Sequence, residues 1–165
     1  MLIVANRLRE ITFGKLMDIY QEGNLENGRE RWPNETAERQ LALAEEDFRQ
    51  YLRECFFPTP GAVYFVWQEN GQYVSALRLE PYQDGLLLEA LETRPTMRRK
   101  GFAAKLIKEM LLTLPKGTIV YSHVSKRNFA SLKTHEVCGF EKMLDYAVYA
   151  DGSVLRNSCT LRIRL

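Results

Sequence analysis

The sequence predicts an α/β fold in which one mixed sheet carries helices on both faces. Short apolar runs of strand length, bounded by turn signals, alternate with stretches whose apolar residues recur at helical spacing. One helical stretch, residues 103–114, separates two runs of strand type, and such a crossover predicts a parallel, right-handed pair. The expected element order is β-α-α-β-β-β-α-β-α-β-β.

The first third of the chain is expected to hold one strand and two helices. Leu2–Leu8 predicts a strand, and Thr12 begins a short helix. Residues 23–33 are polar and rich in Asn, Gly and Glu, which is typical of a loop. A long helix is expected over Thr36–Phe57, ended by Pro58–Gly61. Its predicted buried stripe consists of Leu41, Ala44, Phe48, Leu52 and Cys55.

Three strands are expected in the middle of the chain. Ala62–Gln68 and Gln72–Glu80 flank Asn70-Gly71, the strongest short hairpin signal. After a turn over Pro81–Gly85, the apolar run from Leu86 continues as a strand to Thr93.

The last third is expected to complete the sheet. Thr118–Val124 predicts the strand parallel to Leu86–Thr93, and Phe129–Cys138 predicts a short helix ended by Gly139. Glu141–Tyr149 and Val154–Arg164 then predict a final hairpin across Asp151-Gly152. The closing strand could pair with a second copy, so a homodimer is one expectation.

Composition limits the class of protein. With 165 residues, 45% hydrophobic and 27% charged, residues 1–165 are expected to form one globular domain. A net charge of +2 implies no general polyanion binding. Three widely spaced cysteines form neither a disulfide framework nor a metal pair, which favours a reducing, cytoplasmic location. No signal peptide and no membrane-spanning run are expected.

Three consecutive cations stand at the predicted start of the helix after the Leu86–Thr93 strand. Arg98, Arg99 and Lys100 precede Gly101, although the amide dipoles of a first helical turn favour acidic neighbours. A glycine allows close approach to the backbone, and a helix start with basic neighbours suits a phosphate or pyrophosphate. The alternative is a solvated basic turn.

Two motifs resemble those of a known family. Arg98-x-x-Gly101-x-Ala103 resembles the Arg/Gln-x-x-Gly-x-Gly/Ala signature of the GCN5-related N-acetyltransferase (GNAT) superfamily. Asn128-x-x-Ser131, followed by Gly139-Phe140, resembles the family's later Asn-x-x-Ala/Ser…Gly-Phe helix. The element order is also the GNAT order, although residues 1–61 match only in layout.

The resemblance implies a site for acetyl-coenzyme A as co-substrate. In the family, the amides of the first motif hold the pyrophosphate, and pantetheine enters a gap between two splayed parallel strands. An amide near Leu91 would then face the thioester oxygen. No metal is expected, because two histidines and three scattered cysteines lack ligand spacing. The implied coenzyme-binding residues are Leu91, Glu92, Thr93, Arg98, Arg99, Lys100, Gly101, Phe102, Ala103, Ala104, Asn128 and Ser131.

Glu89 and Glu92 are the candidates for the base that takes the acceptor's ammonium proton. They are an odd number of positions apart on a strand, so they are expected on opposite faces. Glu89 is favoured because partial burial would raise the pKa of a carboxyl in this apolar run. A structural ion pair is the alternative for Glu89, and Glu92 could act through a water.

The acid that would protonate the leaving thiolate is less defined. His135 occupies the register where many members carry tyrosine; it could serve as the acid or be a helix residue bonded to a carbonyl. Tyr146 and Tyr149 are alternative donors. Asn128 and Ser131 could instead form a helix cap. Two further residues are expected only to pack, namely His123 and Cys138.

The predicted function is transfer of an acetyl group from acetyl-coenzyme A to a primary amine of a small-molecule or peptide acceptor, by direct transfer. The alternative is a non-catalytic coenzyme A-binding sensor or interaction module of the same fold. A nucleic-acid binder is disfavoured by the balanced charge. The acidic residues between Glu22 and Glu38 could attract a cationic amine or form a solvated face.

Overall fold

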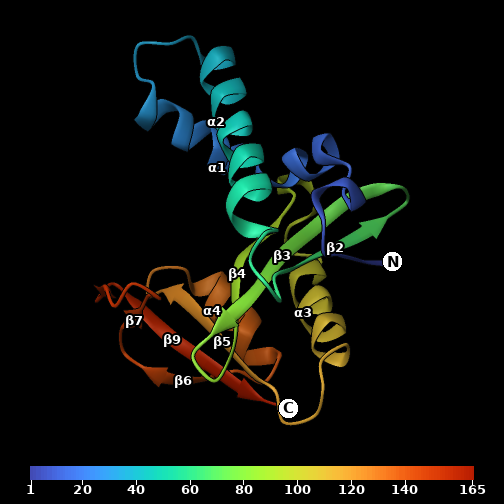
Figure 1. Ribbon diagram of the computed structural model, residues 1–165, viewed down its shortest axis with the longest axis vertical. Helices are drawn as coiled ribbons and strands as arrows, with labels where there is room; N and C mark the ends of the chain where they lie inside the picture. The colour runs from blue at the N-terminus through green and yellow to red at the C-terminus, as the bar shows by residue number, and fades with distance from the viewer.

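A seven-stranded mixed sheet runs through the computed structural model, which describes residues 1–165 (Figure 1). The strand order is β1-β2-β3-β4-β5-β9-β6. Only β4 and β5 pair in parallel; all other neighbours are antiparallel. The predicted mixed sheet and its single parallel crossover are therefore confirmed. The strands are β1 Leu2–Ala5, β2 Val63–Glu69, β3 Gln72–Tyr82, β4 Gly85–Thr93, β5 Ile119–Ser125, β6 Glu141–Leu144 and β9 Ser158–Arg164.

Four α-helices cover the two faces of the sheet. Alternate residues of β2 enter different cores: Tyr64 packs in the core beneath α1 and α2, and Phe65 in the core beneath α3. Figure 1 shows the α1–α2 hairpin at one end of the molecule and β5, β9 and β6 at the other. No helix combines the length and apolarity needed to cross a bilayer. The helices are α1 Phe13–Arg31, α2 Ala37–Tyr51, α3 Phe102–Leu112 and α4 Phe129–Val137.

The loop predicted over residues 23–33 is wrong, because α1 continues to Arg31. Asn24 and Gly28 are buried on the same side of this extension. A Cβ on Gly28 would lie 2.6 Å from the carbonyl oxygen of Gln40, so only glycine permits this approach of α2. Packing against α2 therefore overrides the low helix propensity of the segment.

The second helix was predicted with nearly correct bounds. Thr36 caps α2 by accepting a hydrogen bond from the Arg39 amide. After Tyr51 the chain forms one π-helical stretch, Leu52–Phe56. The wider turn rotates the buried stripe, so Phe56 is buried and Cys55 is exposed, contrary to prediction.

The C-terminal hairpin is interrupted in the structure. Its outer part forms a separate ribbon, β7 Ala147–Val148 with β8 Val154–Leu155, and its inner part pairs β6 with β9. The closing strand, β9, lies between β5 and β6. The expected pairing of this strand with a second copy is therefore wrong, because β9 already has a partner strand on each edge.

Two irregularities at β4 shape the centre of the molecule. Pairing with β5 ends at Leu88↔Ser122, so the two parallel strands separate beyond these residues. On the other edge, Glu89 pairs with Arg78 and Glu92 with Ala76, which leaves two residues of β4 opposite one residue of β3. This bulge is also where Ala90 adopts a positive φ of 48°.

Candidate active site

A slot opens where β4 and β5 separate. It encloses about 170 Å³ and is closed on one side by α4. Leu91 lines it, whereas Glu92 and Thr93 lie beyond it along β4. The facing strand edges carry no ladder hydrogen bonds here, so backbone donors and acceptors are available to an extended ligand. The lining residues are Leu88, Glu89, Ala90, Leu91, Ser122, His123, Val124, Ser125, Asn128, Ser131 and His135.

The start of α3 is open, and several of its backbone amides have no protein acceptor. The first helical bond runs from the Lys105 amide to the Gly101 carbonyl, so the amides of Phe102, Ala103 and Ala104 have no helical acceptor. Those of Arg99, Lys100 and Gly101 also donate to no carbonyl. Gly101 has a φ of +81°, and nothing lies within 4 Å of the position of a Cβ there. The helix start is therefore not blocked by packed side chains.

The three cations at this helix start differ in their partners. Arg99 and Lys100 are exposed and form no ion pair with a carboxylate. Arg98 instead contacts Glu22 at 2.7 Å and Glu92 at 3.2 Å, and it donates to the Thr93 carbonyl. The Arg98 side chain thus ties the end of β4 to α1, and Arg99 and Lys100 are the cations left for an anion.

The bulge places both candidate bases on one face of β4. Their partners Arg78 and Ala76 are two residues apart on β3, so Glu89 and Glu92 point to the same side. The expectation of opposite faces is therefore wrong, because the extra residue at the bulge shifts the alternation by one.

The side chain of Glu89 is mostly buried and lies beside Arg78. Its side chain is 24% exposed, and its Oε2 lies 3.7 Å from Nη2 of Arg78. Burial is the main cause that raises the pKa of Glu89 to about 7; the neighbouring Glu80 adds to the rise and Arg78 opposes it. A carboxyl with this pKa is suited to accept a proton near neutral pH.

One carboxylate oxygen of Glu92 already has hydrogen-bond partners. Its Oε1 accepts from Arg98 at 3.2 Å and from the Thr93 amide at 3.1 Å. These two contacts occupy an oxygen with which Glu92 would otherwise accept a proton.

His135 is held by its own helix. Its Nδ1 lies 2.8 Å from the Ser131 carbonyl, which can only accept, so Nδ1 carries the hydrogen. Burial lowers the pKa of His135, and its buried Nε2 has no protein partner. The neutral ring therefore presents a lone pair, and the carbonyl bond expected for a structural histidine is present.

Asn128 and Ser131 form the N-terminal cap of α4 and also line the slot. Asn128 Oδ1 accepts from the Ser131 amide at 3.0 Å, so the predicted helix cap is present. Both residues also line the slot, which leaves the Asn128 amide nitrogen and the Ser131 hydroxyl near a ligand there.

The remaining sequence candidates lie outside the slot or pack in it. Tyr146 and Tyr149 do not line the slot. His123 packs edge-on between Tyr82 and Tyr149, at centroid distances of 5.4 and 5.2 Å, as a packing histidine should. Burial raises the pKa of the Cys138 thiol, which keeps it protonated and unsuited to nucleophilic attack. No three His, Cys, Asp or Glu side chains form a group that could hold a metal ion.

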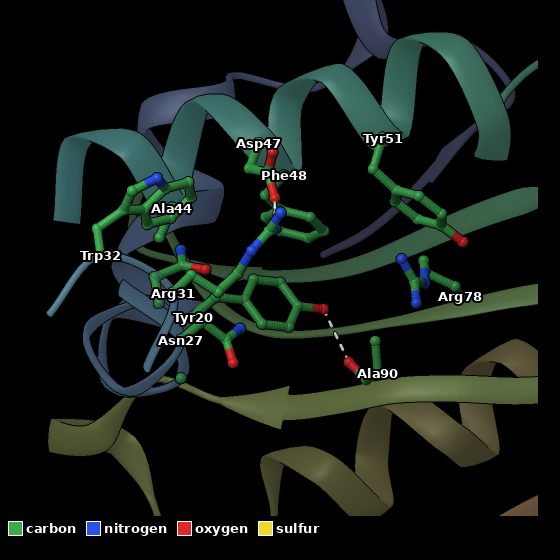
Figure 2. Close-up of a pocket in the computed structure, with 12 residues that line it drawn as sticks. Tyr20, Asn27, Arg31, Trp32, Ala44, Asp47, Phe48, Tyr51, Arg78 and Ala90 are labelled. Carbon is green, nitrogen blue, oxygen red and sulfur yellow. Dashed lines mark hydrogen bonds and ion pairs between the residues drawn. The ribbon is translucent and has the colours of Figure 1, made fainter. Parts of the chain in front are cut away.

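A second pocket, of about 470 Å³, was not predicted from the sequence. It lies between the α1–α2 hairpin and β3–β4, and Figure 2 shows aromatic side chains from both helices around it. Its charged residues are Arg31 and Asp47, which pair with each other, and Arg78. The one sequence signal was Arg78 itself, a charge between Leu77 and Leu79 in an apolar strand.

The slot and the second pocket meet at Ala90, which lines both. The Tyr20 hydroxyl donates to the Ala90 carbonyl at 2.8 Å, as Figure 2 shows, and accepts from the Tyr64 hydroxyl at 2.8 Å. These bonds fix the bulge from the pocket side. The bulge, next to Glu89, is therefore the part of β4 that borders both the slot and the pocket.

Comparison with known proteins identifies the family of the chain. Residues 19–140 match the model of the acetyltransferase (GNAT) family. Comparison with curated protein sequences finds no match.

Solved structures share the fold at low identity. An alanine N-acetyltransferase of a ribosomal protein from Escherichia coli is 17% identical, with a TM-score of 0.62 over 99% of this chain and 94% of that one. PaiA N-acetyltransferase from Thermoplasma acidophilum, in complex with coenzyme A, is 9% identical, with a TM-score of 0.63 over 100% and 99%. A mutant of spermidine N-acetyltransferase SpeG from Vibrio cholerae is 19% identical, with a TM-score of 0.57 over 99% and 94%.

Proposed function

The chain belongs to the acetyltransferase (GNAT) family, and we propose that its 165 residues form a single domain. This domain would transfer an acetyl group from acetyl-coenzyme A to a primary amine. The observation that carries the proposal is the meeting of slot and pocket at Ala90, beside a half-buried carboxyl. Coenzyme A in a solved structure of the same fold supports the assignment of the slot to the coenzyme.

The coenzyme would be held by backbone groups. The amides of residues 99–104 fit a pyrophosphate, with Arg99 and Lys100 adding charge. Pantetheine would bond the unpaired edges of β4 and β5, including Leu91. Glu92 and Thr93 continue this edge toward α3, and Asn128 and Ser131 would contact the coenzyme from α4.

Glu89 would be the base for the transfer. Bound coenzyme supplies an acetyl thioester, whose carbonyl carbon is the electrophile. The acceptor ammonium must lose a proton before its nitrogen lone pair can attack, and Glu89 takes that proton. The C–N bond then forms as the C–S bond breaks; the attacking nitrogen loses its second proton to solvent, and the thiolate takes one proton from solvent. An amide near Leu91 would stabilise the carbonyl oxygen, worth about 3 kcal/mol where such donors have been tested.

His135 would act in the slot as a hydrogen-bond acceptor. With Nδ1 bonded to the Ser131 carbonyl, its neutral ring has no proton to give at Nε2. This leaves the thiolate without an assigned protein acid. The second candidate, a coenzyme A-binding sensor without activity, draws on that observation.

Release of free thiol from acetyl-coenzyme A tests the proposal against the sensor. We expect release that depends on added amine, no mass increase of the intact protein by an acetyl group, and loss of about a hundredfold or more in Glu89→Gln. Glu141→Gln, an exposed carboxyl on β6, is the control and should retain wild-type rates. Coenzyme binding without release from any amine would establish the sensor instead.

The proposal extends to partners and location. The acceptor would be a small molecule or a peptide, with no nucleic acid or membrane partner. Three free cysteines fit a reducing cytoplasm. A homodimer is also proposed, through a surface other than β9, which is paired on both edges, and sedimentation equilibrium at micromolar concentration would test it.

A further inference from the structure

Arg78 is a mostly buried cation with unused hydrogen-bonding capacity. Its side chain is 14% exposed and lines the pocket between the α1–α2 hairpin and β3–β4. Its Nε is buried without a partner, and its closest carboxylate, Glu89, lies at 3.7 Å, beyond hydrogen-bond distance. A guanidinium carries five N–H donors, and burying them unpaired is costly.

Two aromatic rings contact the Arg78 guanidinium without using its donors. The guanidinium carbon lies 5.0 Å from the ring centroid of Tyr51 and 5.4 Å from that of Phe56. Figure 2 shows Arg78 beside Tyr51, on the sheet side of the pocket. Cation–π contacts of this kind help to hold the guanidinium in place, and the planar fork of an arginine matches the geometry of a carboxylate.

The remaining charges in the pocket do not suit a polycation. Asp47 is the only carboxylate that lines it, and Arg31 neutralises Asp47. Glu89 lines the slot, where it is paired with Arg78, and Glu80 neighbours Glu89; neither glutamate lines the pocket. A ligand with several ammonium groups would therefore meet Arg78, which has no hydrogen-bonded partner, and no free carboxylate in the pocket lining.

We propose that the amine acceptor also carries a carboxylate, as an amino acid does, and that Arg78 binds this carboxylate. The inference rests on the proposed acetyl transfer and names its acceptor class. Aromatic and apolar side chains complete the pocket, so an acceptor with an apolar side chain fits best; they are Tyr20, Trp32, Ala44, Phe48 and Tyr51. Arg78 would position the acceptor so that its amine lies at the bulge, near Glu89.

The test compares three pools of amines at equal concentration in the thiol-release assay. The pools are free amino acids, the matched amino acid carboxamides, and spermidine with kanamycin. We expect the wild type to favour the amino acids over their carboxamides by about tenfold or more, as for a charge-assisted pair of hydrogen bonds. Arg78→Gln should bring this ratio close to one, and Arg78→Lys should retain part of it.

Arg78 also affects the protonation of Glu89, but this effect is the same for amino acids and for their carboxamides. It therefore cancels in the ratio of the two rates within each variant. Arg9→Gln, an exposed arginine without an ion pair, is the charge-matched control and should keep the wild-type ratio. Acetyl-coenzyme A binding, measured by calorimetry, checks that each variant is folded.

Two outcomes overturn the inference in different ways. Release from carboxamides or polyamines at rates equal to those with amino acids, or a ratio unchanged in Arg78→Gln, rejects the carboxylate and leaves amine acetylation standing. Release from none of the three pools and from no peptide with a free N-terminal amine, with the coenzyme bound, rejects amine acetylation itself.

Discussion

The Glu89 carboxylate lies 3.7 Å from the Arg78 guanidinium, across the paired strands β4 and β3. Glu80 adjoins the same carboxylate and opposes its ionisation, whereas Arg78 favours it. The protonation of the proposed base is therefore set by two charges on β3 together with burial. Because Arg78 faces the acceptor pocket, a bound carboxylate there would also act on Glu89.

The pH dependence of activity should report this arrangement. The unprotonated carboxylate is the active form, and the pKa of Glu89 is raised to about 7, so kcat/KM should fall as pH decreases through about 7. Glu80→Gln removes a repelling charge and should move this acidic limb down by about one pH unit. Thiol release measured between pH 5 and 9 checks both expectations; a limb that stays in place in Glu80→Gln would contradict them.

The Tyr20 hydroxyl should matter more than that of Tyr64. Tyr20→Phe leaves the Ala90 carbonyl without its donor and the Tyr64 hydroxyl without its acceptor. We expect about 1–3 kcal/mol of destabilisation and a lower kcat, because the bulge loses its anchor. Tyr64→Phe keeps the bond to Ala90 and should cost about 1 kcal/mol with kcat unchanged. Equal kcat values in the two variants would show that the Ala90 bond does not affect the reaction.

Gly28 and Gly23 should respond to alanine in opposite directions. A Cβ on Gly28 meets the Gln40 backbone oxygen at 2.6 Å, which cannot swing away, so Gly28→Ala should destabilise by about 1–3 kcal/mol. Gly23 lies in the same helix with nothing within 4 Å, so Gly23→Ala should stabilise by about 0.5–1 kcal/mol. Urea unfolding measures both. Equal shifts would mean that α1 and α2 do not pack as closely as described.

Local signals were sufficient for much of the fold. Asn70-Gly71 fixes the β2–β3 hairpin, and the helical pattern between two apolar runs fixes the parallel pair β4–β5. The length of α1 was not predictable in this way, because a Gly- and Asn-rich segment becomes helical only when Gly28 packs on α2. Contacts distant in sequence decide that element.

Some features of the candidate site could be predicted from the sequence, and others could not. The open helix start near Gly101 could be predicted from charges that conflict with a helix dipole. The bulge could not, since Ala90 has no sequence signal for a positive φ, and the bulge decides which faces Glu89 and Glu92 share. The pocket around Arg78 could not either, because α1, α2 and β3 assemble it from distant segments.

The proposed acetyl transfer requires that the start of α3 binds an anion. Calorimetric titration with acetyl-coenzyme A, at low and high salt, measures this directly. We expect wild-type binding at micromolar concentration and about tenfold weaker binding by Arg99→Glu at low salt. Lys116→Glu makes the same charge change at an exposed position after α3 and should bind within about twofold of wild type. Absence of wild-type binding, or equal binding by Arg99→Glu and Lys116→Glu, would contradict a pyrophosphate at this helix start.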